Sequence, residues 1–293
     1  MTNRKLYLGP LTDNRRWDSV VLRPDDVVVV SPPKSGTTWM QTIIALLLSG
    51  DAGVETDLAN KMPWVDIRVR DMTDLSERLE AMHCRRSMKT HTPLDGLPID
   101  RRAQYISVFR HPLDVHFSFR EHVRNLGLPV FDAWYPRDDP DGIAFRRFLD
   151  GGPEGFDGDL APLAHILRHF ETAKALSDRP NVSLFHYADM KTDLPGTFAR
   201  LSDLLGVPHS ASVMEQLVHA ASFDNMKTNA DRYSPLADGA PSKLKSDFFH
   251  SGSSGKWHGN LTDAELAAYD AKMDRFLSPD DRAWLEHGAS RTG

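Results

Sequence analysis

The sequence predicts an α/β fold: a single domain in which helices flank a central, mostly parallel sheet. Short continuous apolar runs such as Val27–Val30 are typical of strands that are buried on both faces, as they are in parallel sheets. Stretches with apolar residues three and four positions apart lie between these runs and indicate amphipathic helices. Strands that alternate with helices in this way favour parallel pairing.

Each element follows from its own local pattern. The apolar and β-branched runs predict strands at Val27–Val30, Tyr105–Phe109 and Val182–Phe185, with a weaker one at Ser87–Thr90. The helical pattern predicts helices at Thr38–Ser49, Leu113–Arg124, Leu160–Leu176 and Leu194–Leu205. Gly50 suits the residue after a helix, and Pro112 suits the first helical position.

We expect residues 1–293 to form one domain, since no linker or internal repeat divides the chain. Two long stretches, about 125–159 and 228–256, are rich in loop-forming residues but keep aromatic side chains. Loops of this length inside a compact domain are usually functional or disordered. The aromatic residues favour lids over a binding site.

Composition excludes several classes of partner. The net charge of −6 argues against bulk attraction to nucleic acid or anionic membranes, so a polyanionic ligand needs a local basic cluster. The first ten residues hold no apolar signal segment, and the apolar run Ile43–Leu48 is too short to span a bilayer. We therefore expect a cytoplasmic protein without integral membrane association. The single cysteine, Cys84, is expected to be a small buried side chain.

The segment Ser31–Trp39, "SPPKSGTTW", predicts a P-loop-like phosphate-binding strand-loop-helix. Unpaired amides and the positive end of the helix dipole attract anions at a helix N-terminus. Gly36 lets those amides approach a ligand, Lys34 adds a charge, and three hydroxyls add donors, those of Ser35, Thr37 and Thr38. The lysine precedes the glycine, however, whereas NTP-hydrolysing loops end in Gly-Lys-Ser/Thr.

Basic residues follow two more predicted strands. Arg110 comes directly after the strand at Tyr105–Phe109, and Ser118 lies eight residues further on. Lys89 and His91 lie at the end of the weaker strand, two residues apart, and residues with this spacing share a face in extended chain. Because ligands of open α/β sheets bind at the carboxyl ends of the strands, we expect these groups to converge. Histidine is the usual general base at neutral pH.

Six segments in order resemble the cytosolic-type sulfotransferase family. They are "PKSGTTW", "KTHTPL", "VFRHPLDVHFS", "FHYADM", "ASFDNMK" and "FFHSGSSGKW", and they run from about residue 25 to residue 262. "KTHTPLDGL" and "FHYAD" look closest to the bacterial branch of the family. The resemblance implies an enzyme that moves a sulfuryl group from 3′-phosphoadenosine 5′-phosphosulfate (PAPS) to an acceptor and leaves 3′-phosphoadenosine 5′-phosphate (PAP).

The resemblance also implies roles for individual residues. The cofactor contacts would be Lys34, Ser35, Gly36, Thr37, Thr38, Trp39, Arg110, Ser118, Tyr187, Phe223 and Gly252. Among them, Trp39 and Phe223 would enclose the adenine with Tyr187 at its edge. Arg110 and Ser118 would hold the 3′-phosphate, and the loop after the first strand would hold the 5′-phosphosulfate.

The catalytic residues implied by the resemblance are His91, Lys34 and Lys89. His91 would remove the proton of the acceptor, while the two lysines would stabilise charge in the transition state. Sulfuryl transfer, like phosphoryl transfer, depends mainly on in-line positioning and charge stabilisation. No metal is needed for this chemistry.

One segment departs from the family pattern. His250-Ser251, followed by Gly252, stand where the family usually has Arg-Lys-Gly. A charge-assisted contact contributes roughly 1.5–3 kcal/mol, so we expect weaker PAPS binding in which Arg110 carries most of the 3′-phosphate recognition. Candidates for compensation are Lys243, Lys245 and Lys256.

The acceptor is expected to be a small molecule with a hydroxyl on an apolar body: an alcohol, phenol, sterol-like compound or glycolipid. Aromatic and apolar residues that are candidates for its pocket, although each taken alone favours plain core, are Pro63, Trp64, Phe117, Phe131, Trp134 and Tyr135. The oligomeric state stays open.

Two alternative functions are a P-loop-type small-molecule kinase and a non-catalytic nucleotide-binding relative. The kinase requires the Gly-Lys-Ser/Thr order and a magnesium-binding carboxylate after a strand, and neither is evident. The basic pair missing at His250-Ser251 favours the non-catalytic relative, whereas the presence of Lys34, Lys89 and His91 argues against it.

Overall fold

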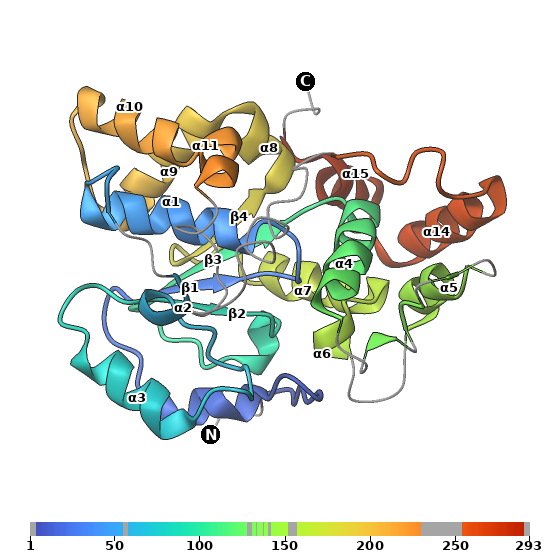
Figure 1. Cartoon of the computed structure of the whole chain (residues 1–293), viewed down its shortest axis with the longest axis horizontal. Helices are drawn as coiled ribbons and strands as arrows, with labels where there is room; N and C mark the ends of the chain where they lie inside the picture. The colour runs from blue at the N-terminus through green and yellow to red at the C-terminus, as the bar shows by residue number, and fades with distance from the viewer. Residues whose placement is uncertain are drawn as a thin grey trace.

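A computed structural model describes residues 4–54, 58–127, 131–132, 134–136, 138–139, 142–151, 157–229 and 254–289. Its centre is a parallel four-stranded sheet in the order β2-β1-β3-β4. The strands are β1 (Val27–Val30), β2 (Ser87–Thr90), β3 (Gln104–Phe109) and β4 (Val182–His186). Helices pack on both sides of this sheet (Figure 1), which confirms the predicted fold class.

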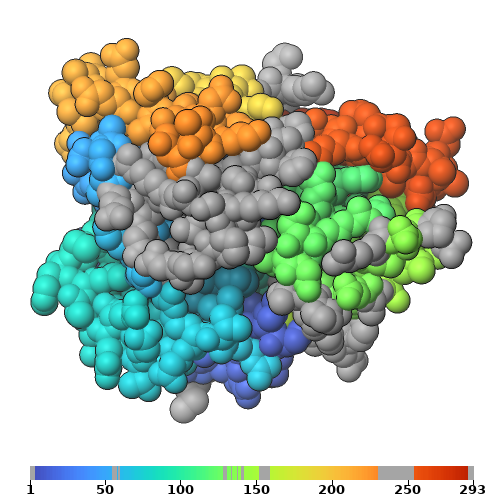
Figure 2. Space-filling model, viewed as in Figure 1, coloured from blue at the N-terminus to red at the C-terminus, as the bar shows by residue number. Residues whose placement is uncertain are grey.

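The helices connect the strands and cover the sheet. They are α1 (Thr37–Ser49), α2 (Leu58–Lys61), α3 (Met72–Ala81), α4 (Pro112–Leu126), α5 (Ile143–Asp150), α6 (Asp157–Leu160), α7 (Leu163–Lys174), α8 (Tyr187–Thr192), α9 (Leu194–Leu205), α10 (Ala211–Ala220), α11 (Phe223–Thr228), α14 (Asp263–Phe276) and α15 (Pro279–His287). Two short 3₁₀ helices are η1 (Asn14–Ser19) and η2 (Leu94–Gly96). In Figure 2, α10 and α11 (orange) and α3 (teal) lie at opposite ends of one face, with α4 (green) and α14 (red) at its side.

Alternate residues of each strand face different cores, which explains the continuous apolar run of β1. Val27 and Val29 pack with α1, α9 and α10, whereas Val28 and Val30 pack in a second core with α3, α4, α5, α7 and α14. All four valines are 0–1% exposed. A strand covered on both faces needs no polar alternation.

The bounds of the predicted helices agree with those of the observed helices to within two residues, except for one helix. The α9 helix agrees with the prediction at both ends, and α1 begins one residue earlier than expected and ends at Gly50 in the left-handed conformation (φ 66°). The single helix predicted over Leu160–Leu176 is wrong, because α6 ends at Leu160 and α7 begins at Leu163. Between them Ala161 has φ 48° and Pro162 caps α7; proline disfavours a helical preceding residue and has no N–H to continue the ladder.

The structure bears on the predicted burial of Cys84 and on the predicted lids. Cys84 is exposed, so its predicted burial is wrong: it lies in the irregular connection between α3 and β2 rather than on an apolar face. In the stretch 125–159, Phe145 and Phe148 of α5 are 3% and 1% exposed and belong to the core. Most of 228–256 lies outside the described residues, so the lids stay a prediction.

Candidate active site

The predicted site residues lie at the carboxyl ends of the four strands. Lys34 follows β1, Lys89 ends β2 with His91 just beyond it, Arg110 follows β3, and Tyr187 begins α8 directly after β4. The chain passes from β1 to β2 on one side of the sheet and then returns to β3 on the other side of β1. Such a switch point leaves a crevice at the strand ends in which ligands bind.

The loop between β1 and α1 has an unusual backbone. Lys34 has φ 65°, a left-handed conformation that is uncommon for a residue with a side chain and often marks a functional position. Gly36, the N-cap of α1, has φ 108°, and a Cβ there would lie 3.0 Å from Cδ2 of Tyr187. The glycine is therefore required both by its own conformation and by the close approach of the tyrosine ring.

Donor groups gather at the start of α1. The hydroxyls of Ser31 and Thr37 are 2.6 Å apart and hydrogen-bonded. The Ser35 hydroxyl is fully buried and has no hydrogen-bond partner among the described residues. Together with the first amides of the helix, which have no partner within it, this hydroxyl suits an anion with several oxygen atoms.

Positive charges converge on this loop although the chain is acidic. Nη1 of Arg110 lies 3.4 Å from the carbonyl oxygen of Lys34, to which it donates, and the guanidinium lies 4.5 Å from the ring centroid of Tyr187. Burial, and then the charges of Arg110 and Lys89, lower the pKa of Lys34 to about 7. Burial lowers the pKa of Lys89 to about 8, against the opposing effect of Asp66. Cations crowded in this way favour a bound anion.

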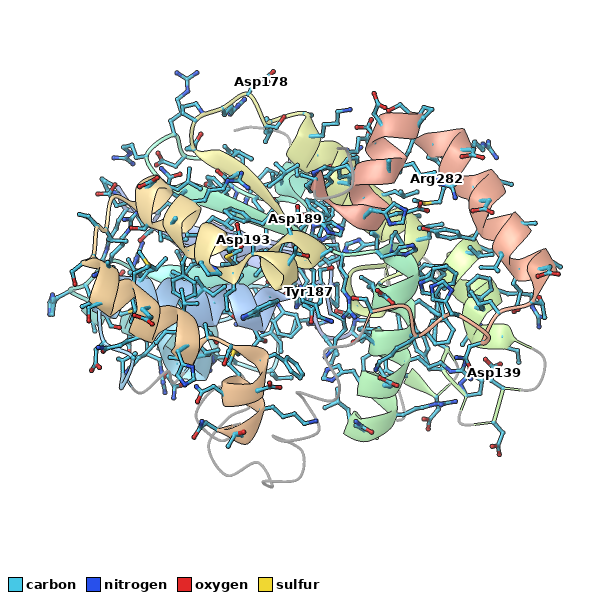
Figure 3. All side chains as sticks on the ribbon, turned by 90° about the horizontal axis from the view of Figure 1, so that it is seen from above. Asp139, Asp178, Tyr187, Asp189, Asp193 and Arg282 are labelled. Carbon is cyan, nitrogen blue, oxygen red and sulfur yellow. The ribbon has the colours of Figure 1, made fainter. Side chains whose placement is uncertain are left out.

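A second group of predicted contacts surrounds Tyr187. The rings of Trp39 and Tyr187 pack edge to face, with centroids 5.4 Å apart. Trp39 donates its Nε1–H to the carbonyl of Ala221 at 2.8 Å, which brings the first turn of α1 next to the chain that leads to half-buried Phe223. Figure 3 shows Tyr187 between α1 and α4. The three aromatic residues expected around a purine thus come from adjoining elements.

His91 has a defined tautomer. Its Nδ1 lies 2.7 Å from the carbonyl oxygen of Ser31; because a carbonyl only accepts, Nδ1 carries the proton and Nε2 keeps its lone pair. Burial, and then the charge of Lys89, lower the pKa of His91 to about 3. The ring is therefore neutral at neutral pH, and the lone pair of Nε2 can accept a hydrogen bond.

Trp64 packs against the two catalytic candidates. Its ring meets that of His91 edge to face at 4.8 Å, and Nζ of Lys89 lies 5.0 Å from its centroid. Pro63 accepts the backbone N–H of Lys89 at 2.9 Å. Of the other aromatic residues considered for an acceptor pocket, the three at Phe131, Trp134 and Tyr135 are 3–5% exposed and lie in the core.

The described end of the late segment contacts α4. The backbone N–H of Gly255 donates to Asp114 at 2.7 Å, and Lys256 forms an ion pair with Glu121. Ser118 is half-buried on the same helix between those two carboxylates. The residues at 243, 245 and 250–252, including Gly252, lie outside the described residues, so their roles stay predictions.

The sequence did not single out several polar neighbours of His91. Asp66 is fully buried and accepts the hydroxyls of Thr90 and Thr92, at 2.8 and 2.7 Å. His165 and His169, one turn apart on α7, both lie within hydrogen-bond distance of the His91 carbonyl. Their spacing on a buried helical face was a usable signal, but 13 histidines in the chain made any one of them uninformative.

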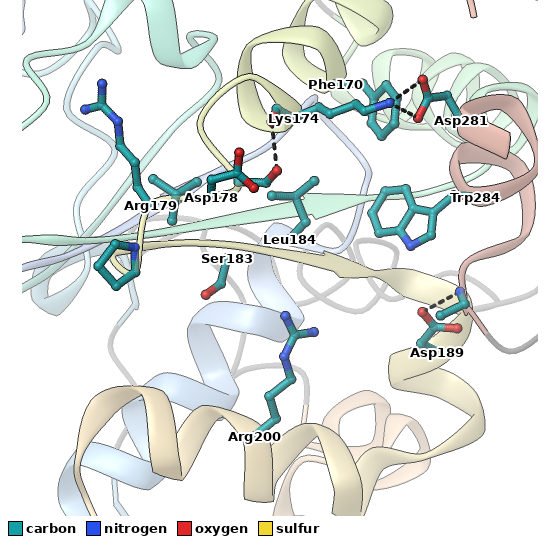
Figure 4. Close-up of a pocket in the computed structure, with 14 residues that line it drawn as sticks. Phe170, Lys174, Asp178, Arg179, Ser183, Leu184, Asp189, Arg200, Asp281 and Trp284 are labelled. Atoms are coloured by element: carbon teal, nitrogen blue, oxygen red, sulfur yellow. Dashed lines mark hydrogen bonds and ion pairs between the residues drawn. The ribbon is translucent and has the colours of Figure 1, made fainter. Parts of the chain in front are cut away.

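A separate hollow lies beside β4, away from these residues (Figure 4). It is lined by Val182, Ser183, Leu184, Arg200 and Trp284 among others, and Lys174 at its rim is paired with Asp281. None of the predicted site residues lines it.

Within the described ranges no group of histidine, cysteine and carboxylate side chains could hold a metal ion. No helix in those ranges is long and apolar enough to cross a membrane.

Comparison with known proteins identifies the class. The family model described as a sulfotransferase domain matches residues 24–279. The chain belongs to this family, and it is a sulfotransferase enzyme of the bacterial branch. This finding confirms the resemblance and excludes the kinase alternative.

Individual relatives agree with this assignment. The chain is 32% identical to a glycolipid sulfotransferase of Mycobacterium bovis, over 98% of this chain and 96% of the relative. It is 26% identical to human Sulfotransferase 1E1, over 88% and 87%.

Two crystal structures share the fold, each with 22% sequence identity. One is mouse sulfotransferase SULT7A1 complexed with PAP, with a TM-score of 0.71 and 91% of this chain and 90% of that one covered. The other is retinol dehydratase in complex with androsterone and inactive cofactor PAP, with a TM-score of 0.67 and 95% and 91% covered.

Proposed function

We propose that this sulfotransferase moves a sulfuryl group from PAPS to the hydroxyl of an apolar small molecule. The observation that carries the proposal is the placement of the His91 imidazole, with Nδ1 held by the Ser31 carbonyl, at the same carboxyl edge of the sheet as Lys34 and Lys89. A proton acceptor beside an anion loop is the arrangement that transfer to a hydroxyl requires.

The residues at the strand ends suit a donor with phosphate groups at both ends of an adenosine. The buried hydroxyl of Ser35 and the first amides of α1 would take the 5′-phosphosulfate. Arg110, with Ser118 on α4, would take the 3′-phosphate. Lys256, paired with Glu121 on the same helix as Ser118, would supply part of the positive charge missing at His250-Ser251.

In the proposed mechanism His91 would accept a proton, and Lys34 and Lys89 would stabilise negative charge. His91 Nε2 would take the proton of the acceptor hydroxyl as the acceptor oxygen bonds to sulfur. Lys34 would neutralise the charge that develops on the bridging oxygen as the sulfur–oxygen bond to the phosphate breaks. Lys89 would stabilise the transferring group between them. These interactions strengthen in the transition state and so accelerate the reaction.

For the acceptor we propose an apolar alcohol, a phenol or a glycolipid, with glycolipid the first choice. Trp64 forms an apolar wall beside His91, and the mycobacterial relative named for glycolipid matches nearly the whole chain. A cytoplasmic location belongs to the same proposal.

The first test is an acceptor screen with radiolabelled PAPS against glycolipids, sterols, phenols and long-chain alcohols. We expect label in at least one apolar hydroxyl compound and none in matched compounds whose hydroxyl is methylated. Label only in polar acceptors would reject the proposed acceptor class.

The second test is His91→Ala. We expect turnover to fall by about 10²- to 10⁴-fold, the usual contribution of a general base, while PAP affinity measured by calorimetry stays unchanged. Exposed His83 offers a control, because His83→Ala should alter neither quantity. Unchanged turnover in His91→Ala would show that another group is the base.

A further inference from the structure

His91 is held at its backbone as well as at its ring. Its carbonyl oxygen lies 3.1 Å from Nε2 of His165 and 3.0 Å from Nε2 of His169. A carbonyl oxygen has two lone pairs, and the two histidines therefore fill its whole hydrogen-bonding capacity.

The state of the two donors follows from the same contacts. Because a carbonyl cannot donate, both rings carry a proton on Nε2. Burial is the main cause that lowers the pKa of His165 to about 4 and that of His169 well below its usual value. Both rings are neutral donors at neutral pH, and they pack edge to face with centroids 4.7 Å apart. They can act on His91 through geometry but not through charge.

The chain on either side of His91 is anchored too. Thr90 and Thr92 both donate their hydroxyls to Oδ2 of Asp66. Beyond them, Arg168 on α7 donates to Asp95 in η2 at 2.6 Å. The α7 helix thus contacts both the carbonyl of His91 and the turn that follows it, whereas the threonine hydroxyls and the His91 ring are bonded to Asp66 and Ser31.

We propose that His165 and His169 are positioning residues that orient His91 through its carbonyl. Fixing this peptide sets the direction of the His91 side chain, so that Nδ1–H reaches Ser31 and Nε2 faces the acceptor. A general base works only within hydrogen-bond reach of its proton, and a small displacement of a reacting group greatly reduces the rate. The inference rests on the proposed role of His91 as base.

The first experiment reads the His91 ring directly and needs no turnover. Nuclear magnetic resonance of protein with isotope-labelled histidine, saturated with PAP, should show His91 protonated at Nδ1 alone. In His165→Leu with His169→Leu we expect the Nδ1 proton signal to weaken or shift and the Nε2 tautomer to appear. Glutamine carries an amide N–H near the place of Nε2, so His165→Gln and His169→Gln should keep the wild-type signal.

The control is His209→Leu. His209 Nε2 also contacts a backbone carbonyl, that of Leu47 at 2.7 Å, but it belongs to a different part of the molecule. Its loss should leave the His91 signal unchanged. If the double leucine variant fails to fold, the two single leucine variants give the same comparison.

The second experiment uses the best acceptor found in the screen. Each single leucine variant should lower kcat about tenfold, the upper range for one lost hydrogen bond, with KM for PAPS unchanged and with most of kcat restored by glutamine. An unaltered His91 tautomer in folded leucine variants would overturn the proposal, as would an equal loss of kcat in His209→Leu. If wild-type protein transfers no sulfuryl group, the proposed function fails, but the His91 spectrum still decides the positioning proposal.

Discussion

At the scale of single residues, Lys34 links backbone conformation to charge. Lys34 has a left-handed φ of 65°, and its ammonium group is affected by burial and by the charges of Arg110 and Lys89. Burial first, and then these cations, disfavour the charged form and lower its pKa. A residue kept in such a state is typical of a binding site rather than of a stable core.

The lowered pKa predicts how PAP binding depends on pH. Above about pH 7 Lys34 loses its proton in the free enzyme, but binding a polyanion favours the charged form, so PAP binding must take up a proton. The phosphate groups, whose second pKa is about 6, are already ionised there. Calorimetry should show PAP affinity falling between pH 7 and pH 9, by up to about tenfold per pH unit for each lysine.

The matched variant for this prediction is Lys34→Met, which keeps most of the length of the side chain. Its PAP affinity should be weaker at pH 7 and should depend less on pH. Equal wild-type affinities at pH 7 and pH 9 would contradict the lowered pKa. Calorimetry in two buffers of different ionisation enthalpy would count the protons taken up.

At the scale of elements, one end of the sheet carries residues proposed to bind ligands, and the other carries a buried ion pair that we expect to stabilise the fold. The carboxyl ends of β1 and β2 carry the proposed site. Their amino ends are joined by a buried ion pair between Asp26 and Arg86, which are 2% and 3% exposed. Arg86 Nε donates to Asp26 Oδ1 at 2.9 Å, and a further guanidinium N–H donates to Val21. The loop at the carboxyl end of β1 has a left-handed residue, Lys34, whereas the amino ends of β1 and β2 are held together by the ion pair.

Removing one partner of that pair should destabilise the fold but leave the site intact. Asp26→Asn leaves a buried guanidinium without its counter-charge, and we expect the free energy of unfolding to fall by about 3–5 kcal/mol. The exposed pair Asp74–Arg78 is the control, because Asp74→Asn should cost less than about 1 kcal/mol. Denaturant titration measures both changes. A loss as small as that of the control would show that the buried pair contributes little.

At the scale of the whole molecule, the proposed site joins segments that are far apart in sequence. Lys34, Arg110 and Tyr187 follow three different strands, and Gly255 is hydrogen-bonded to Asp114 of α4. A ligand that bridges these segments should therefore stabilise the whole fold. The net charge of −6 makes this stabilisation depend on the local cluster rather than on bulk attraction.

This arrangement predicts that PAP stabilises the protein more than AMP, which lacks the 3′-phosphate. A charge-assisted contact to that phosphate contributes roughly 1.5–3 kcal/mol, or about tenfold or more in affinity. In Arg110→Gln the difference between the two nucleotides should largely disappear. Comparing the nucleotides within each variant, by thermal shift and calorimetry, cancels any effect of the substitution on the free protein. Equal affinities for PAP and AMP in wild type would put the donor in doubt.

Much of the fold could be predicted because its signals are local. Val27–Val30, the loop with Gly36, and helix α9 follow from apolar runs, turn residues and helical spacing within a few positions of each other. The split between α6 and α7 also had a local cause in Pro162, which the helical spacing around it concealed. The exposure of Cys84 could not be predicted from its neighbours in sequence, because burial depends on which other parts of the chain cover a residue.

The sequence by itself determined which residues stand at the ends of the strands, because parallel strands bring their carboxyl ends to one edge whatever else the chain does. Lys34, Lys89, His91 and Arg110 are in this group. Only the tertiary structure decided which neighbours complete them, since hydrogen bonds such as those from His165 and His169 to His91 join residues more than 70 positions apart. Contacts at that separation depend on how α7 packs against the sheet, and no local pattern contains that packing.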